Sequence, residues 1–241
     1  MNITQLQQAI SEELLRQIGF IQPIVQAHEA EAYHRLIRLT QNSPSLFLIL
    51  AEPWLVEPIS ETVLSVLLAC ANIHLCLRVI DDAIDENELI HQQNLLRVQP
   101  LYWQVLYQLG TNNPYLQTEV VQLIQETVAA VAKDDQQSSP WDWGAKNHHL
   151  LLVPLLLSQH SEAYQQVKPV LSLMIALTQA CEECSQHKIT QDNLNAVLEL
   201  IQNALKPSHI RQLHQGGWLT AANQMTHDAN RLLGQLQHHF F

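Results

Sequence analysis

Apolar residues recur every three or four positions along most of the chain, which is the spacing of one face of an α-helix. Leu6, Ile10, Leu14 and Ile18 show this spacing near the start of the chain. The same period predicts helices over about 24–39, 60–85, 93–109, 115–133, 162–187, 191–205 and 219–237, and a further helix that resumes near 145 and kinks at Pro154. The pattern therefore predicts an all-α protein.

Proline, glycine and polar runs predict the breaks between these helices. The segment 42–58 holds three prolines and is expected to be broken or to contain a short helix. Gly110 is expected to end a helix. The polar stretch 134–144 is the clearest predicted loop, and Lys206-Pro207 and Gly216-Gly217 punctuate the end of the chain.

The stretch from Val63 to Ile80 is apolar on all sides, and Ser60 is expected to cap its start. Asn72, His74 and Arg78 interrupt it, so it predicts a buried helix surrounded by other helices and no integral membrane segment. A buried arginine must be paired, and Asp81 and Asp82 are the expected partners of Arg78. No repeat or linker divides the chain, so one helical bundle over residues 1–241 is predicted.

Composition narrows the range of functions. The 241 residues carry a formal net charge of −11, which disfavours nucleic acid and an anionic membrane surface. A phosphorylated ligand is still compatible if a divalent metal bridges the two negative partners. The first 20 residues lack the basic and apolar regions of a signal peptide, so a cytoplasmic protein with reduced, buried cysteines is expected.

The segment 80–86 holds the most informative cluster of charges. Asp81 and Asp85 are four residues apart, so on a helix they share a face, with Cβ atoms roughly 5–6 Å apart. Their carboxylates repel each other, and the dipole of a helix C-terminus adds to the penalty. A bound cation such as Mg²⁺ would relieve both effects, whereas a solvated acidic helix end is the alternative interpretation.

Asp81-Asp82-Ala83-Ile84-Asp85 fits the DDxxD motif, and His74 stands seven positions before it. In these residues the chain resembles the class I isoprenoid synthases of the trans-prenyltransferase branch, as a divergent member. The resemblance implies a bundle around a central cavity, Mg²⁺ as cofactor and a prenyl diphosphate as substrate. It also implies that Asp81, Asp82 and Asp85 are catalytic, with Asp81 and Asp85 binding metal, and it makes a homodimer a further expectation.

Weaker matches follow in the family's order, so the resemblance covers roughly residues 60–195. Lys146-Asn147 is similar to a Lys-Thr pair that opens a helix, and Gln179 precedes Glu182-Glu183, which stand in place of a second acidic motif. The resemblance implies substrate binding by Lys146 and Gln179 and metal binding by Glu182 and Glu183. Arg97, with His91, is the nearest substitute for the basic group that follows the first motif.

Departures from the family's pattern keep several functions open. The Gly-Lys-Arg segment that helps to bind isopentenyl diphosphate is absent, because 42–58 holds no lysine or arginine. This absence favours cyclisation, hydrolysis or an unusual acceptor over chain elongation. One alternative is a non-catalytic relative that acts as a regulatory or partner subunit, and another is an unrelated helical binding protein with an accidental DDxxD.

Overall fold

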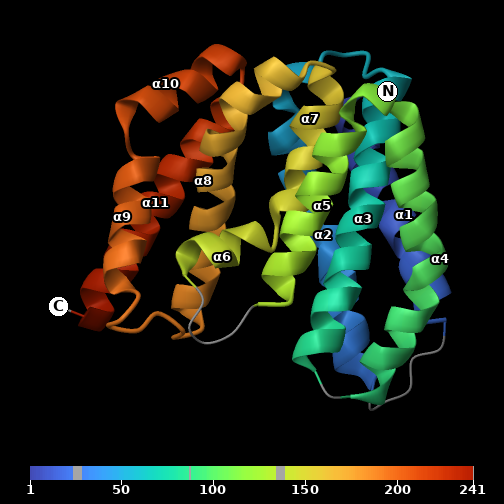
Figure 1. The fold of residues 1–241 in the computed structure, drawn as a ribbon, viewed down its shortest axis with the longest axis horizontal. Coiled ribbons are helices and arrows are strands. Elements are labelled where there is room, and N and C mark those ends of the chain that lie inside the picture. Colours follow the sequence, from blue (N-terminus) through green and yellow to red (C-terminus); the bar gives the residue numbers. More distant parts are fainter. Residues whose placement is uncertain (24–28, 87, 134–138, 241) are drawn as a thin grey trace. The chain divides into compact units, whose positions relative to one another are not determined.

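The computed structural model describes residues 1–23, 29–86, 88–133 and 139–240. The regular secondary structure in these ranges is entirely helical (Figure 1), so the all-α prediction is confirmed. The chain forms two compact units. Unit 1 comprises Met1–Val121 and Leu152–Gln159, and unit 2 comprises Gln122–Leu151 and His160–Phe241. The single domain expected over 1–241 stays a prediction.

The first helix of unit 1 is α1 (Ile3–Ile21). It begins with a capping box, in which Asn2 Oδ1 accepts from the Gln5 backbone N–H and Gln5 Oε1 accepts from the Asn2 N–H, both at 2.9 Å. Its apolar stripe of Leu6, Ile10, Leu14 and Ile18 is fully buried, as the sequence spacing predicted.

The second helix corrects a prediction. α2 (Ala30–Ala51) runs through Pro44, so it extends well past residue 39, where this helix was expected to end. The segment 42–58 does contain a short helix, the 3₁₀ turn η2 (Glu52–Trp54), and the chain is not helical over 55–60. Pro44 has no N–H to give to the Thr40 carbonyl. The Ser11 hydroxyl of α1 donates to that carbonyl instead, at 3.0 Å. The predicted residues 24–28 of this helix lie outside the described ranges.

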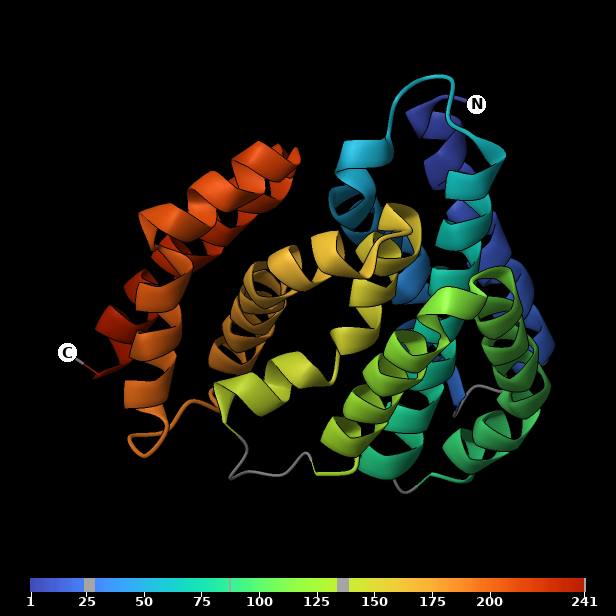
Figure 2. The ribbon, with the colours of Figure 1, turned by 45° about the horizontal axis from the view of Figure 1, so that its top comes forward.

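Unit 1 is built around α3 (Glu61–Asp85), whose N-cap Ser60 accepts from the Val63 N–H at 3.3 Å, as predicted. It packs against α1, α2, α4 (Leu89–Asn112) and α7 (Leu152–Ser158), several of which are visible around it in Figure 2. Within the described ranges, α3 is the one helix that is long and apolar enough to cross a bilayer, but 61% of its most apolar window is buried. It therefore gives no clear membrane-spanning segment.

The predicted helix end at Gly110 is also wrong. α4 continues through Pro100 and Gly110 to Asn112, and the 3₁₀ turn η3 (Pro114–Leu116) leads into α5 (Gln117–Val131). Leu101, Val105 and Leu109 are buried on one face of α4, so packing supports the helix up to the glycine, and the helix ends two residues later.

Unit 2 contains a short helix where a loop was predicted. Residues 134–138 of that loop lie outside the described ranges, but Pro140–Ala145 form α6, which begins with a capping box between Ser139 and Asp142. At Gly144 a Cβ would stand 2.6 Å from the Ala176 Cβ of α8 (Ser161–Ser185), so the close packing of α6 on α8 requires a glycine.

The remaining helices of unit 2 surround α8. The 3₁₀ helix η4 (His148–Leu151) contacts α8, and α9 (Leu194–Ala204), α10 (Pro207–Gly216) and α11 (Leu219–Phe240) also pack on it. The expected breaks at Lys206-Pro207 and Gly216-Gly217 are the two ends of α10, which the sequence pattern did not predict as a separate helix. Gly217 ends α10 with a φ of 86°, a left-handed conformation that favours glycine. Pro154 was expected to kink a helix. It lies in the first turn of α7, where the missing N–H removes no hydrogen bond within the helix.

We predict that Ser11→Ala lowers the free energy of unfolding by about 1–2 kcal/mol, because it leaves the Thr40 carbonyl without its donor. In a Pro44→Ala background the same change should cost less, since an alanine at this position restores an N–H for that carbonyl. Urea unfolding of the four proteins in this cycle measures the coupling. Ser45→Ala, at an exposed position one residue from Pro44, is the control and should stay within about 0.5 kcal/mol of the parent. Equal costs of Ser11→Ala in both backgrounds would contradict the argument.

Candidate functional site

The last turn of α3 carries the three aspartates of the predicted motif in three different environments. The Asp82 residue is 3% exposed, Asp81 is partly buried, and Asp85 is exposed as the final residue of the helix. The sequence prediction that the three acids lie at one helix end is correct. Their unequal burial gives each carboxylate a different surrounding charge.

Arg78 pairs with both of the first two aspartates. Its Nη2 lies 2.6 Å from Asp82 Oδ1, and its Nη1 lies 3.3 Å from Asp81 Oδ2. All three residues belong to α3, and the spacings of three and four residues bring their side chains onto one face. The predicted pairing of Arg78 is therefore confirmed.

A second arginine, Arg35 of α2, contacts the Asp82 carboxylate, and sequence reasoning missed it. Arg35 Nη1 lies 3.8 Å from Asp82 Oδ1 and 2.5 Å from Glu86 Oε1. Burial works against the charge on Arg35, but Glu86, Asp82 and Glu31 together hold its pKa above the usual value. Arg35 lies 46 positions before Asp81, so no local pattern connects it with the motif.

The two arginines only partly offset the burial of Asp82. Burial raises the pKa of Asp82 above its usual value, Arg78 and Arg35 lower it, and the neighbouring Asp81 raises it again. The sum of these effects is a raised pKa. The ionised form of Asp82 therefore depends on both guanidinium groups.

Two ionisable side chains in the turns of α3 before the aspartates, His74 and Cys76, are neutral at pH 7. His74 stacks edge-on against Phe47 of α2, with ring centroids 5.8 Å apart. Burial, with Arg78 nearby, lowers the pKa of His74 to about 4, so its ring is neutral at pH 7. Burial likewise raises the pKa of the Cys76 thiol to about 12. The described cysteines at 70, 76, 181 and 184 are all buried and form no disulfide, as expected.

The second predicted acidic segment lies on α8 in unit 2, where its two glutamates differ sharply. Glu183 is buried, accepts from Gln179 Nε2 at 2.8 Å and lies 3.4 Å from Lys188 Nζ, whereas Glu182 is exposed. Asn147 Nδ2 donates to Gln179 Oε1 at 3.2 Å. The structure thus brings Gln179 together with Glu183 and with the neighbour of Lys146.

Two other predicted substrate-binding residues, Lys146 and Arg97, each lie beside the C-terminal end of a helix. Lys146 is the C-cap residue of α6 and is partly exposed. Arg97 of α4 donates from Nη1 to the Ile21 carbonyl at 3.3 Å, where its charge suits the C-terminal end of α1. Substrate binding by Lys146, Gln179 and Arg97 stays a prediction.

The end of α3 offers as many protein ligands as a bound magnesium ion commonly takes. Mg²⁺ commonly takes one or two carboxylates and completes its shell with water and phosphate oxygens. Asp81 and Asp85 supply two carboxylates on one helix face. Arg78 contacts one oxygen of Asp81, whereas Asp82 is contacted by both Arg78 and Arg35. Across residues 1–23, 29–86, 88–133 and 139–240, no three His, Cys, Asp or Glu side chains are grouped closely enough to hold a metal by themselves. These residues therefore fit an ion that shares its shell with a ligand better than a closed structural site.

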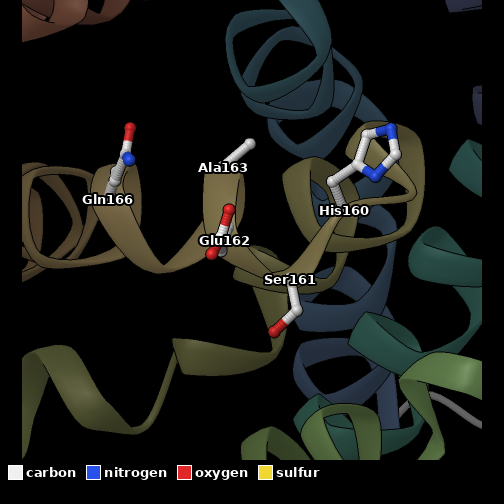
Figure 3. A pocket seen from close by; sticks show the side chains of 5 residues that line it. All are labelled: His160, Ser161, Glu162, Ala163 and Gln166. Atoms are coloured by element: carbon white, nitrogen blue, oxygen red, sulfur yellow. The ribbon is translucent and has the colours of Figure 1, made fainter.

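A hollow at the start of α8 involves none of the predicted site residues. Figure 3 shows its lining, which comes from the first turns of α8 and the residue before it: His160, Ser161, Glu162, Ala163 and Gln166. The hollow is open to solvent, and all of its residues belong to one short segment of unit 2. Its lining residues therefore do not combine side chains from different helices.

No protein-family model, curated protein sequence or solved structure matches this chain. The resemblance to class I isoprenoid synthases therefore depends on the motif residues themselves.

We predict that Arg78→Met lowers the free energy of unfolding at pH 7.5 by about 2 kcal/mol. This is less than the loss of a partner from a fully buried pair, because the Arg78 side chain is 35% exposed. Arg38→Met is the matched control. Arg38 pairs with Glu31, and both side chains are more than half exposed, so its loss should cost well under about 1 kcal/mol.

The pH dependence gives a second test of the same substitution. Without Arg78 the folded-state pKa of Asp82 rises further above its unfolded value, so the folded variant takes up a proton at a higher pH than the wild type. The stability difference between wild type and Arg78→Met should be largest above that pKa and should shrink as the pH falls through it. Urea unfolding at several pH values between 7.5 and 4.5 measures this difference. A difference that does not change with pH would count against the pairing with Asp82.

Proposed function

We propose that this protein is a Mg²⁺-dependent class I isoprenoid enzyme that acts on an allylic prenyl diphosphate. One observation carries the proposal. A buried apolar helix presents Asp81 and Asp85 one turn apart at its end, while Asp82 between them is held by Arg78 and Arg35. The order of residues along α3 also matches the first motif of that family, including His74.

In this proposal Asp81 and Asp85 hold the metal, and Asp82 supports them. Bound Mg²⁺ would supply electrostatic stabilisation of the departing diphosphate. Arg78 and Arg35 act as positioning residues, because they fix the Asp82 carboxylate and reduce the repulsion among the acids. Metal or substrate binding by Glu182, Glu183, Lys146 and Gln179, which belong to unit 2, and by Arg97 stays a prediction from the sequence resemblance.

The scarcity of basic residues favours ionisation over chain elongation. Diphosphate recognition uses arginine forks and lysines. Arg35 and Arg78 already pair with carboxylates, and Arg97 donates to a backbone carbonyl. A second diphosphate substrate would need more cations than these, so terpene synthase-type ionisation or transfer to a different acceptor fits better than addition of isopentenyl diphosphate.

The alternative is a non-catalytic protein with the same helical architecture, acting as a regulatory or partner subunit. A specific observation favours it: the buried Glu183 is already paired with Lys188 and bonded to Gln179. A carboxylate committed in this way is a poor metal ligand unless Lys188 moves.

The two proposals predict different results with purified protein, Mg²⁺ and C10, C15 and C20 allylic diphosphates, each with and without isopentenyl diphosphate. We expect diphosphate release that falls by at least about 100-fold in Asp81→Asn/Asp85→Asn, because the metal-borne stabilisation is lost. Glu12→Gln/Glu61→Gln is the control, since it removes two exposed charges from other parts of unit 1.

Dependence of the release on isopentenyl diphosphate would separate elongation from ionisation. Thermal unfolding with and without Mg²⁺ and inorganic diphosphate tests binding independently of turnover. Release without any effect of the double substitution would refute the assigned metal ligands. No release and no Mg²⁺-dependent stabilisation would favour the non-catalytic subunit.

A further inference from the structure

Arg35 of α2 is held at the end of α3 by contacts that a ligand can replace. Its side chain is 30% exposed, and its shortest ion pair is with Glu86. Asp82 Oδ1 and Glu31 Oε1 lie further away, at 3.8 and 3.9 Å from its nitrogen atoms. The Glu86 side chain is itself 32% exposed. An ion pair between two solvent-accessible side chains contributes little to stability, so Arg35 can leave Glu86 at low cost.

The helix end does not depend on the side chain of Glu86. α3 ends at Asp85, and Glu86 follows it with an extended backbone conformation. The Glu86 backbone N–H donates to the Asp82 carbonyl at 3.0 Å, so its main chain ends the helix whatever its side chain contacts. The carboxylate of Glu86 can therefore give up Arg35 without any loss of helical structure.

Arg78 is fixed more firmly than Arg35. Its Nη2 lies 2.6 Å from Asp82 Oδ1, and only 4% of the Asp82 side chain is exposed. Removal of Arg78 would leave this buried carboxylate without its closest cation, which costs much more than the loss of an exposed pair. While Arg78 stays in place, Asp82 keeps a partner even if Arg35 moves. Of the two arginines, Arg35 is therefore the one that can exchange its partner.

We propose that Arg35 releases Glu86 and donates to a phosphate oxygen of a magnesium-bound diphosphate. This inference rests on the proposed function, in which Asp81 and Asp85 hold the metal. Arg35 reaches the same turn of α3 from another helix, because it lies beside Asp82. The guanidinium group suits phosphate oxygens, to which it donates two parallel hydrogen bonds. Glu86 is then an internal competitor that occupies Arg35 until the anion binds.

Charge makes the two ligands of this site respond differently to the loss of Arg35. The guanidinium group repels Mg²⁺ and attracts diphosphate. Without it, the aspartates should bind Mg²⁺ alone at least as tightly as before, whereas diphosphate should bind more weakly. A purely structural role for Arg35 predicts that both ligands bind more weakly, because a misplaced Asp82 carboxylate would disturb the metal site as well.

Calorimetric titrations of the full chain at pH 8, with Mg²⁺ alone and with inorganic diphosphate in excess Mg²⁺, test the assignment. We expect Arg35→Met to weaken diphosphate binding by about 10- to 100-fold, since one charge-assisted hydrogen bond is lost, and not to weaken Mg²⁺ binding. Arg35→Lys should recover part of the affinity. Arg38→Met is the matched control: it removes the same charge from an exposed position of α2 and should change diphosphate binding by less than about threefold.

Glu86→Gln tests the competition with the opposite sign, and it leaves Arg35 in place even if Arg35→Met does not fold. Loss of the competing carboxylate should tighten diphosphate binding by about two- to fivefold. Glu88→Gln is its control, because it removes a nearby negative charge from a side chain that is 63% exposed, and it should have a smaller effect. Circular dichroism checks that all variants keep their helices.

Diphosphate binding that Arg35→Met leaves unchanged would overturn the assignment. So would a Glu86→Gln variant that binds diphosphate more weakly, or no more tightly than Glu88→Gln does. If diphosphate binds through Asp81 and Asp85 but is insensitive to Arg35, this inference alone fails. If the wild-type chain binds no diphosphate in the presence of Mg²⁺, the proposed function fails together with it.

Discussion

The burial of the Asp82 carboxylate at the end of an apolar helix is the constraint that organises unit 1. A buried charge needs compensating partners, and Arg78 on the same helix is only one of two. The second, Arg35, requires α2 to lie beside the end of α3. Further along the two helices, Phe47 of α2 contacts His74 of α3, so the helices run in opposite directions. This alignment needs α2 to remain helical past Pro44, and the Ser11 hydroxyl compensates the carbonyl that the proline leaves unbonded.

Sequence periodicity predicted the helices well wherever one face is continuously buried, as in α1 and α3. It failed where a local helix-breaking signal competes with packing. Pro44 and Gly110 both suggest breaks. Buried side chains continue on α2 beyond Pro44, whereas α4 runs only two residues past Gly110, to Asn112. The hydrogen bond that makes Pro44 tolerable joins residues 29 positions apart, so no local rule contains it. α6 was missed for the opposite reason, because its six residues are too few to show a period.

The same distinction explains how much of the site the sequence could predict. Asp81, Asp82, Asp85 and Arg78 lie within two turns of one helix, so their spacing alone sets which side chains meet. Arg35 is invisible to that reasoning, because its role depends on how α2 packs. In unit 2, the bond between Asn147 and Gln179 and the pairing of Glu183 with Lys188 depend on the packing of α6 and on the turn after α8. Residue types at motif positions indicated where acids lie, but not which of them are already neutralised.

The balance of charge at the end of α3 shows where the two proposed functions diverge. Four carboxylates, those of Asp81, Asp82, Asp85 and Glu86, lie there with the guanidinium groups of Arg35 and Arg78. Two negative charges remain in excess at a helix end whose dipole already disfavours anions, and a divalent cation would offset both. Both an active enzyme and a non-catalytic subunit would therefore bind a cation here, so cation binding does not distinguish the two proposals. The basic residues that would bind the diphosphate distinguish the two proposals. The chain has 12 Lys and Arg residues, and several of them are already paired, so few are left for this role.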